Sequence, residues 1–100
     1  MEPQYLPEMI VKVAGGRQLS TTLAGEVVIL DIEKGVYYGL DTVGAEVWAR
    51  LQSPSRLGEL VDHVVDRYDV DRPTAQADIQ SLLQEMFALG LIERDDQAAP

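Results

Sequence analysis

The sequence predicts an α+β domain of the winged helix-turn-helix type, in which a three-stranded antiparallel sheet is followed by three helices. Strand-forming segments gather before residue 41, whereas helical spacing of apolar residues dominates after it. The chain has 100 residues, 46% hydrophobic and 25% charged, which suits one globular domain with a single core. We expect an N-terminal extension over residues 1–8, the domain over 9–93 and a flexible tail over 94–100.

Two segments near the N-terminus have strand character. Residues 9–13 are a short β-branched run that ends before the turn-forming pair Gly15-Gly16. Residues 19–23 are polar and rich in threonine, so the sequence leaves a strand and a loop open there.

The clearest local signal is a β-hairpin. A β-branched stretch over residues 26–32 is followed by a tight turn at 33–35, where Gly35 accepts the positive φ that a short hairpin requires. Residues 36–40 then resume as a strand. Period-2 alternation puts Tyr37 on one face of this strand and its neighbours on the other: Val36, Tyr38 and Leu40.

The first helix is expected to begin at Asp41 or Thr42, either of which is well placed as an N-cap. Its apolar residues recur at helical spacing: Val43, Val47, Trp48 and Leu51. The segment Ser53-Pro54-Ser55 breaks this helix and caps the next one. The second helix carries a continuous apolar stripe formed by Leu57, Leu60, Val61, Val64, Val65 and Tyr68.

A third helix is expected over residues 73–90. Pro73 suits its first turn, where the missing N–H is not needed, and Gly90 suits its C-terminal end. One face of this helix is apolar, formed by Ile79, Leu82, Leu83, Met86 and Leu89. Residues 91–92 are then expected to fold back as a short strand.

The net charge excludes several classes of partner. The chain carries 8 basic and 17 acidic residues, for a net charge of −9. Proteins that bind nucleic acids neutralise phosphates with Lys and Arg, yet residues 73–93 contain neither. The same acidity disfavours an anionic membrane surface, and no apolar run approaches the ~20 residues that cross a bilayer. We therefore expect neither a nucleic acid nor a membrane as partner.

No catalytic or metal-binding set is apparent in the sequence. Cysteine is missing, and the single histidine, His63, has no second His or Cys to complete a zinc site, so we expect it to face solvent. The acids of residues 62–71 lack the glycine-centred loop of a calcium site and are interpreted as a solvated face. No glycine-rich phosphate-binding motif follows the turn glycines. We therefore expect a protein that is not an enzyme and holds no cofactor or metal.

The hairpin leaves a binding hypothesis. A strand over residues 36–40 at the edge of a sheet exposes N–H and C=O groups that an extended peptide can pair with as an added strand. The alternative is that Tyr37 and Tyr38 are packing aromatics and the third helix covers the edge. The residues alone leave both open.

Residues 28–48 as a whole resemble the PqqD-like family, the leader-peptide recognition elements of ribosomally made, post-translationally modified peptides. The matching features are an aliphatic strand that ends in Leu30-Asp31, a glycine turn, Tyr37-Tyr38-Gly39-Leu40 and the helix start Val43-Gly44-Ala45-Glu46-Val47-Trp48. The later helix from 60 to 68, the step Ala77-Asp78-Ile79 and the closing Leu89-Gly90-Leu91-Ile92 also resemble the family, so the resemblance covers about residues 7–93. Asp41 stands where asparagine is common in the family, and both residues cap helices.

The resemblance implies a non-catalytic protein that binds the leader of a precursor peptide as a strand added to residues 36–40, beside the helix over 73–90. A free-standing domain of this size is most similar to the small recognition protein of lasso-peptide pathways, which places it in a bacterial cytoplasm. The implied partners are the precursor leader, a transglutaminase-like leader peptidase and an asparagine-synthetase-like cyclase. The alternative within the family is a PqqD-type peptide chaperone for a radical-SAM maturase. Outside it, the competing hypotheses are a winged-helix DNA-binding regulator and a dimer that pairs two hairpin edges.

Transferred to this sequence, the resemblance assigns backbone pairing to the strand of Val36, Tyr37, Tyr38, Gly39 and Leu40. The wall of an apolar pocket is expected from Leu30, Ile32, Tyr38, Ile79, Leu82, Leu83 and Met86. Tyr37 is expected to rim the site from the other face, and Asp78 and Glu85 to meet basic leader residues. On this basis the substitution Met86→Asp is expected to weaken peptide binding by burying an unpaired charge.

Overall fold

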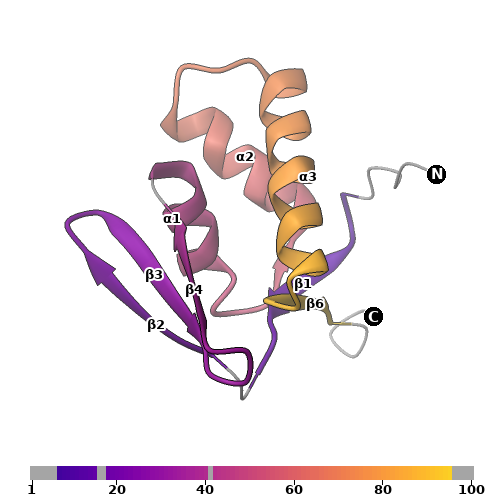
Figure 1. The fold of residues 1–100 in the computed structure, drawn as a ribbon. Coiled ribbons are helices and arrows are strands. Elements are labelled where there is room, and N and C mark those ends of the chain that lie inside the picture. The colour runs from indigo at the N-terminus through magenta and orange to yellow at the C-terminus, as the bar shows by residue number, and fades with distance from the viewer. Residues whose placement is uncertain (1–6, 16–17, 41, 96–100) are drawn as a thin grey trace.

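The predicted class is confirmed by a computed structural model, which describes residues 7–15, 18–40 and 42–95 (Figure 1). The described part is an α+β domain with three helices and two small antiparallel sheets. Its elements are β1 (Ile10–Val13), β2 (Gln18–Leu23), β3 (Glu26–Asp31), β4 (Val36–Leu40), α1 (Thr42–Arg50), β5 (Ser55–Arg56), α2 (Leu57–Arg67), α3 (Arg72–Ala88) and β6 (Ile92–Arg94).

The strands form two sheets rather than one. Strands β2, β3 and β4 pair in that order, so the threonine-rich segment that the sequence left open is a strand. Strand β1 instead pairs with β5 and β6 in a second sheet. The short strand expected near residue 92 is thereby confirmed as β6, whereas β5 was not predicted. Two residues carry no periodicity, and only their partner in β1 makes them a strand.

The turn between β3 and β4 is organised by Asp31. Its backbone carbonyl accepts the N–H of Gly35 at 2.8 Å, and its Oδ1 accepts the N–H of Lys34 at 3.0 Å. Gly35 has φ +68°, as the tight turn requires. Because these bonds begin the turn at Asp31, Ile32 lies in the turn and not at the end of the preceding strand, where the sequence placed it.

The core lies between the inner face of the β2–β3–β4 sheet and the three helices, and it includes buried side chains of β1 and β6. Helix α1 packs on β3 and β4, while α2 packs on α3. On β3 the alternation is clear, because Val27 and Ile29 are buried toward α1. The indole Nε1–H of Trp48, a buried residue of α1, donates to Ser20 Oγ on β2 at 3.1 Å. All three strands of this sheet therefore have a defined inner and outer face.

The residues that cap the helices differ in part from those that the sequence predicts. The N-cap of α2 is Arg56, and not a serine, with its N–H donating to Glu59 Oε1 at 3.2 Å. Ser55 instead closes the end of α1, where its Oγ donates to the Arg50 carbonyl at 3.1 Å. Thr42 begins α1 with φ +41°, and Asp41, the other expected cap, lies outside the described residues.

The outer boundaries of the domain extend beyond the expected ones. The carbonyl of Pro7 accepts the N–H of Gly58 at 2.9 Å, so the chain is already tied to α2 within the expected extension. At the other end Arg94 pairs with Val11, and the Asp95 N–H donates to the Ile10 carbonyl at 2.9 Å. Arg94 therefore belongs to the second sheet and Asp95 is hydrogen-bonded to it, whereas both were predicted in the tail over 94–100, of which residues 96–100 lie outside the described part.

The positive φ of Gly35 predicts that a side chain at this position lowers the stability of the fold. We expect Gly35→Ala to lower the free energy of unfolding by about 1 kcal/mol, because a Cβ disfavours positive φ. Gly39, on β4, has no positive φ and open space around its missing Cβ, so Gly39→Ala is the matched control and should be neutral or slightly stabilising. Urea unfolding followed by circular dichroism measures both, and equal effects would contradict the turn geometry.

Helix α3 predicts a pH dependence through its N-cap, Asp71. Hydrogen bonds from the backbone N–H and the hydroxyl of Thr74 lower the pKa of the Asp71 carboxyl below its ordinary value. Since the folded pKa lies below the unfolded one, the carboxylate stabilises the fold above the unfolded pKa, and this contribution is lost as pH falls through the folded pKa.

Asp71→Asn keeps an N-cap acceptor but does not titrate, and it therefore isolates this effect. We expect the stability difference between wild type and this variant to shrink as pH is lowered from 7 toward 3. Urea unfolding at a series of pH values tests it, and a difference that does not change with pH would refute the assignment.

Candidate functional site

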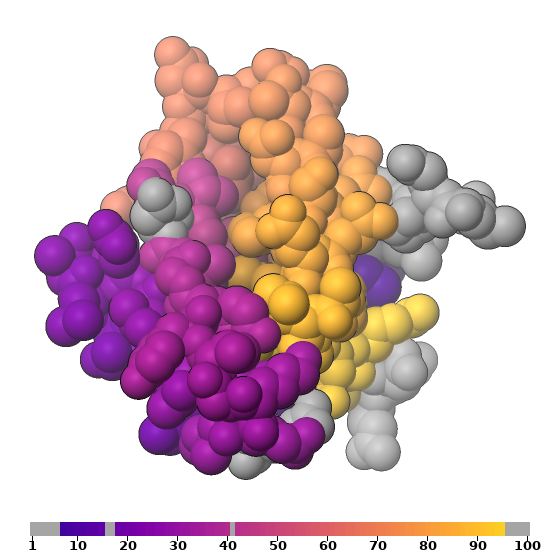
Figure 2. All heavy atoms as spheres, viewed as in Figure 1, coloured from indigo at the N-terminus to yellow at the C-terminus, as the bar shows by residue number. Residues whose placement is uncertain are grey.

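One edge of the β2–β3–β4 sheet has no partner strand among the described residues and faces α3. Strand β4 pairs only with β3, as the predicted hairpin requires. Figure 1 shows β4 as the strand on the α3 side of the sheet, and Figure 2 shows the atoms of the two elements next to each other. At the turn end of β4, Lys34 Nζ donates to the Leu89 carbonyl at 3.3 Å and links the hairpin to the end of α3.

The other end of β4 leads into a cavity of about 550 Å³ between α1, the end of α2 and α3. The cavity is mostly apolar, with polar groups along its α3 side. Its lining comprises Thr42, Val43, Gly44, Val64, Tyr68, Val70, Asp78, Ile79, Ser81, Leu82 and Glu85. The side chain of Leu40 approaches Gly44 so closely that a Cβ there would lie 3.4 Å from it. The end of β4 therefore adjoins the cavity wall at Gly44, and the β4 edge and the cavity together are the candidate site.

Tyr68 closes the α2 side of this cavity. Burial, together with the negative charge of the neighbouring Glu46, raises the pKa of the Tyr68 hydroxyl above its ordinary value. Glu46 also accepts from Arg67 Nε at 2.9 Å and lies 3.1 Å from His63 Nε2. His63 is thus half-buried in a polar cluster between α1 and α2, rather than facing solvent as expected. Glu46, His63 and Arg67 do not line this cavity, so the polar cluster lies outside it, beside Tyr68.

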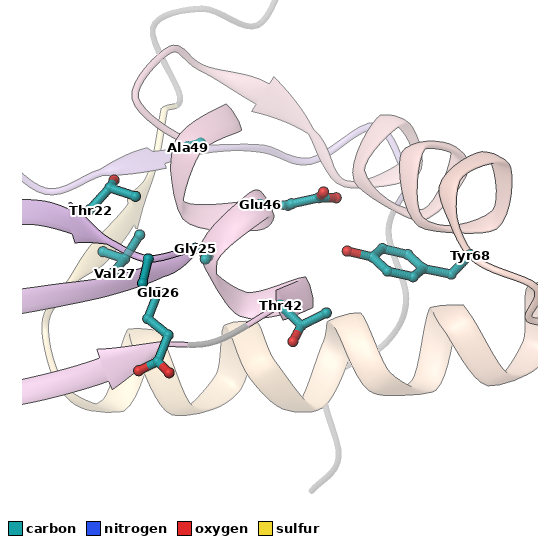
Figure 3. Close-up of a pocket in the computed structure, with 10 residues that line it drawn as sticks. Thr22, Gly25, Glu26, Val27, Thr42, Glu46, Ala49 and Tyr68 are labelled. Atoms are coloured by element: carbon teal, nitrogen blue, oxygen red, sulfur yellow. The ribbon is translucent and has the colours of Figure 1, made fainter.

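A second cavity, of about 640 Å³, lies on the other side of Thr42 and Tyr68 (Figure 3). It is lined by the tip of the β2–β3 hairpin, by α1 and by Tyr68, and includes Glu26 and Glu46. Figure 3 shows the Tyr68 side chain pointing toward α1 from the opposite wall. The two cavities share Thr42 and Tyr68, but no residue of α3 lines this second one, so it is not part of the candidate site although it is the larger of the two.

The structure brings part of the predicted site together. Four α3 residues of the prediction line the cavity: Asp78, Ile79, Leu82 and Glu85. On β4, Tyr38 and Leu40 are half-buried on the inner face, and Tyr37 is 71% exposed on the outer face, as the alternation predicts. Gly39 and Val36 are exposed on the same strand.

Five predicted wall residues do not line the cavity, and one of them is Tyr38, on the inner face of β4. Met86 and Leu83 are core residues, only 2% and 3% exposed, and do not line the cavity. Leu30 pairs with Tyr37 and so lies on the outer face, opposite to Tyr38. Ile32 is exposed in the turn. The helical stripe and the strand alternation show which residues are apolar, but they do not separate core positions from cavity positions.

Local patterns in the sequence do not reveal the part of the wall contributed by α1 and α2. Val43, Val64 and Tyr68 were recognised only as apolar positions of helices, and Val70 only as part of a connector. Tyr68 carried the one available signal, because a tyrosine at the end of an apolar stripe keeps a polar tip near water. Among the described residues, no group of three or more His, Cys, Asp or Glu side chains is placed to hold a metal ion. None of the described helices is long and apolar enough to span a membrane.

Comparison with known proteins identifies relatives of this arrangement. The sequence profile of the family described as coenzyme PQQ synthesis protein D (PqqD) matches residues 26–92, from β3 to β6. The structure of TbiB1 in complex with the TbiA(beta) leader peptide superposes with a TM-score of 0.76 at 35% sequence identity, covering 82% of this chain and 94% of that chain. The structure of lasso peptide synthetase B1 complexed with the leader peptide gives a TM-score of 0.74 at 20% identity, covering 83% and 96%, and shares the fold. No curated protein sequence matches.

The different environments of Leu82 and Met86 predict different responses to the same change. We expect Met86→Gln to lower the free energy of unfolding by about 2–4 kcal/mol, because it buries an amide without partners and removes core packing. Leu82→Gln should cost less than half as much, since its amide reaches the open cavity. Thermal melts of both variants test this, and equal destabilisation would contradict the cavity. For the same reason Met86→Asp reports on folding and is unsuitable as a test of binding.

Proposed function

The chain belongs to the PqqD family, and we propose that it binds the leader segment of a ribosomal precursor peptide without catalysing a reaction itself. The observation that carries this proposal is the unpaired edge of β4 next to an apolar cavity, in a chain 35% identical to a protein whose structure contains a leader peptide. An exposed edge invites pairing unless it is blocked, and β4 has neither a proline nor a charged side chain to block it.

Strand addition accounts for affinity and specificity separately. The backbone of an extended leader pairs with the free N–H and C=O groups of β4, which contributes affinity for any sequence. One of its apolar side chains then enters the cavity between Val43 and Leu82, where burial yields roughly 25 cal/mol per Å² of apolar surface. Asp78 and Glu85 face the same cavity and favour a basic residue next to that anchor.

The bound leader is then delivered to a processing enzyme, and we place this in lasso-peptide biosynthesis. Both solved relatives are complexes with leader peptides, and one is a lasso peptide synthetase B1. The processing enzyme is a leader peptidase of the transglutaminase-like type, followed by an asparagine-synthetase-like cyclase. Holding the substrate at the peptidase raises its effective concentration there, which accelerates cleavage without any catalytic group on this chain.

A second candidate, a peptide chaperone for a radical-SAM maturase, is favoured by the family description itself, which concerns coenzyme PQQ synthesis. It uses the same site and differs in the precursor and in the enzyme served. A winged-helix DNA-binding function is disfavoured, because α3 presents Asp78 and Glu85 and its Arg72 is paired with Asp62.

Fluorescence polarisation with labelled leader peptides, including the TbiA(beta) leader, tests strand addition. Successive residues of an added strand point their N–H groups alternately toward and away from β4. N-methylation of every second residue in the paired stretch should therefore weaken binding about tenfold, and N-methylation of the residues between them should change it less than about twofold. No binding to any leader, or a loss that does not alternate, would contradict the proposal.

The cavity is tested in the same assay with Leu82→Gln, which should weaken leader binding by about tenfold through loss of the apolar anchor site. Phe87→Gln is the matched control, because Phe87 is half-buried on the same helix but does not line the cavity. It should bind like the wild type. If both variants bind equally well, the anchor does not enter this cavity.

A further inference from the structure

The exposed large apolar side chains of the described residues all lie in the β2–β3–β4 sheet and its turns. They are Leu19, Leu23, Ile32, Val36 and Tyr37. Single exposed apolar residues are normal on any protein, but a contiguous group is typical of an interaction surface. Here they come from one of the two sheets, whereas the exposed surfaces of all three helices lack such residues.

The strand register places three of these five side chains, Leu19, Leu23 and Tyr37, on one face of the sheet. Leu19 on β2 is opposite Leu30 on β3, which is opposite Tyr37 on β4, so the three form one row across the sheet. The next row is Thr21, Val28 and Gly39, and the third begins with Leu23 beside Glu26. We call this surface the outer face. Its only charged member among these residues is Glu26, at the hairpin tip.

Nothing in the described part of the chain covers the outer face. Trp48 of α1 bonds Ser20, which points to the inner face, and Val27 and Ile29 are buried on that side. Leu19 and Leu23 remain 62% and 60% exposed on the opposite side. The proposed leader does not cover this face either, because an added strand pairs edge to edge with β4 and lies in the plane of the sheet.

The net charge of the chain favours a different protein over a second copy of this chain as the partner of the outer face. A second copy would bring a net charge of −9 against −9, which opposes association. A different protein with an apolar centre and a rim of Lys or Arg meets no such repulsion, and Glu26 is placed to contact that rim.

The outer face adjoins the leader site, so a protein bound to this face would lie next to the leader. The backbone of Tyr37 lies in the β4 edge, while its side chain lies in the outer face, so the two sites are continuous. We propose that the outer face docks the enzyme that processes the bound leader, an inference that rests on the proposed function. Tyr37 and Leu19 lie on either side of Leu30 and are the two most exposed large apolar side chains of this face, so they are the contacts assigned to the enzyme, because a few large side chains supply most of the binding energy of an interface.

The test uses Leu19→Lys, because β2 lies farthest from the β4 edge in the sheet order and lysine is tolerated on an edge strand. Gln84→Lys on the exposed surface of α3 adds the same charge away from the outer face and is the matched control. Each protein is titrated with the labelled leader peptide by fluorescence polarisation. Each is then titrated with a transglutaminase-like leader peptidase, the processing enzyme of the proposed function, by isothermal titration calorimetry.

We expect Leu19→Lys to weaken peptidase binding by at least about tenfold, with leader affinity within about twofold of the wild type. Gln84→Lys should match the wild type in both titrations. Peptidase binding unchanged by Leu19→Lys, or undetectable for the wild type, would overturn the proposal. A wild-type dimer in sedimentation that Leu19→Lys converts to a monomer would also overturn it, in favour of a second copy. If the wild type does not bind the leader, the proposed function is contradicted instead. The leader titration and the peptidase titration therefore distinguish failure of the proposed function from failure of the docking proposal.

Discussion

The packing of one sheet face on α1 determines how the rest of the surface is used. The inner face of β2–β3–β4 is packed in the core through Val27, Ile29 and the Trp48–Ser20 bond. Because side chains alternate along a strand, every second residue of these strands points outward. Strand β4 is last in the strand order of this sheet and has a partner on one side only. The edge, the cavity at its end and the apolar outer face are thus three results of a single arrangement, in which a three-stranded sheet is covered on one face alone.

Local signals in the sequence were sufficient for the hairpin and the three helices. Gly35 specifies the turn through its own backbone, and the stripe from Leu57 to Tyr68 needs no distant partner to be recognised. Strands β2 and β5 depend on partners instead. Residues 18–23 are exposed at five of six positions, so they show no alternation of burial, and they are ordered by pairing with β3 and by the Trp48–Ser20 bond.

The candidate site was harder to predict, for a reason visible in α3. Ile79, Leu82, Leu83 and Met86 all follow the apolar spacing of a helix, yet only Ile79 and Leu82 line the cavity. Which side of an apolar stripe is packed depends on α1 and α2, whose placement no local pattern contains. The polar cluster around Glu46 is similar, since it joins residues of two helices and includes a histidine that the sequence showed only as isolated.

The pairing of β1 with β6 has a bearing on how such a domain is built into larger proteins. Residues 10 and 95 are joined by a hydrogen bond, so the chain enters and leaves through the same small sheet. A unit whose entry and exit points adjoin can be inserted into a surface loop of another protein with little loop-closure entropy and without distorting either fold. The second sheet contributes no residue to β4, to the cavity or to the outer face. The domain is therefore suited to transfer as a module, either alone or embedded in an enzyme, with its binding surfaces unaffected by the junction.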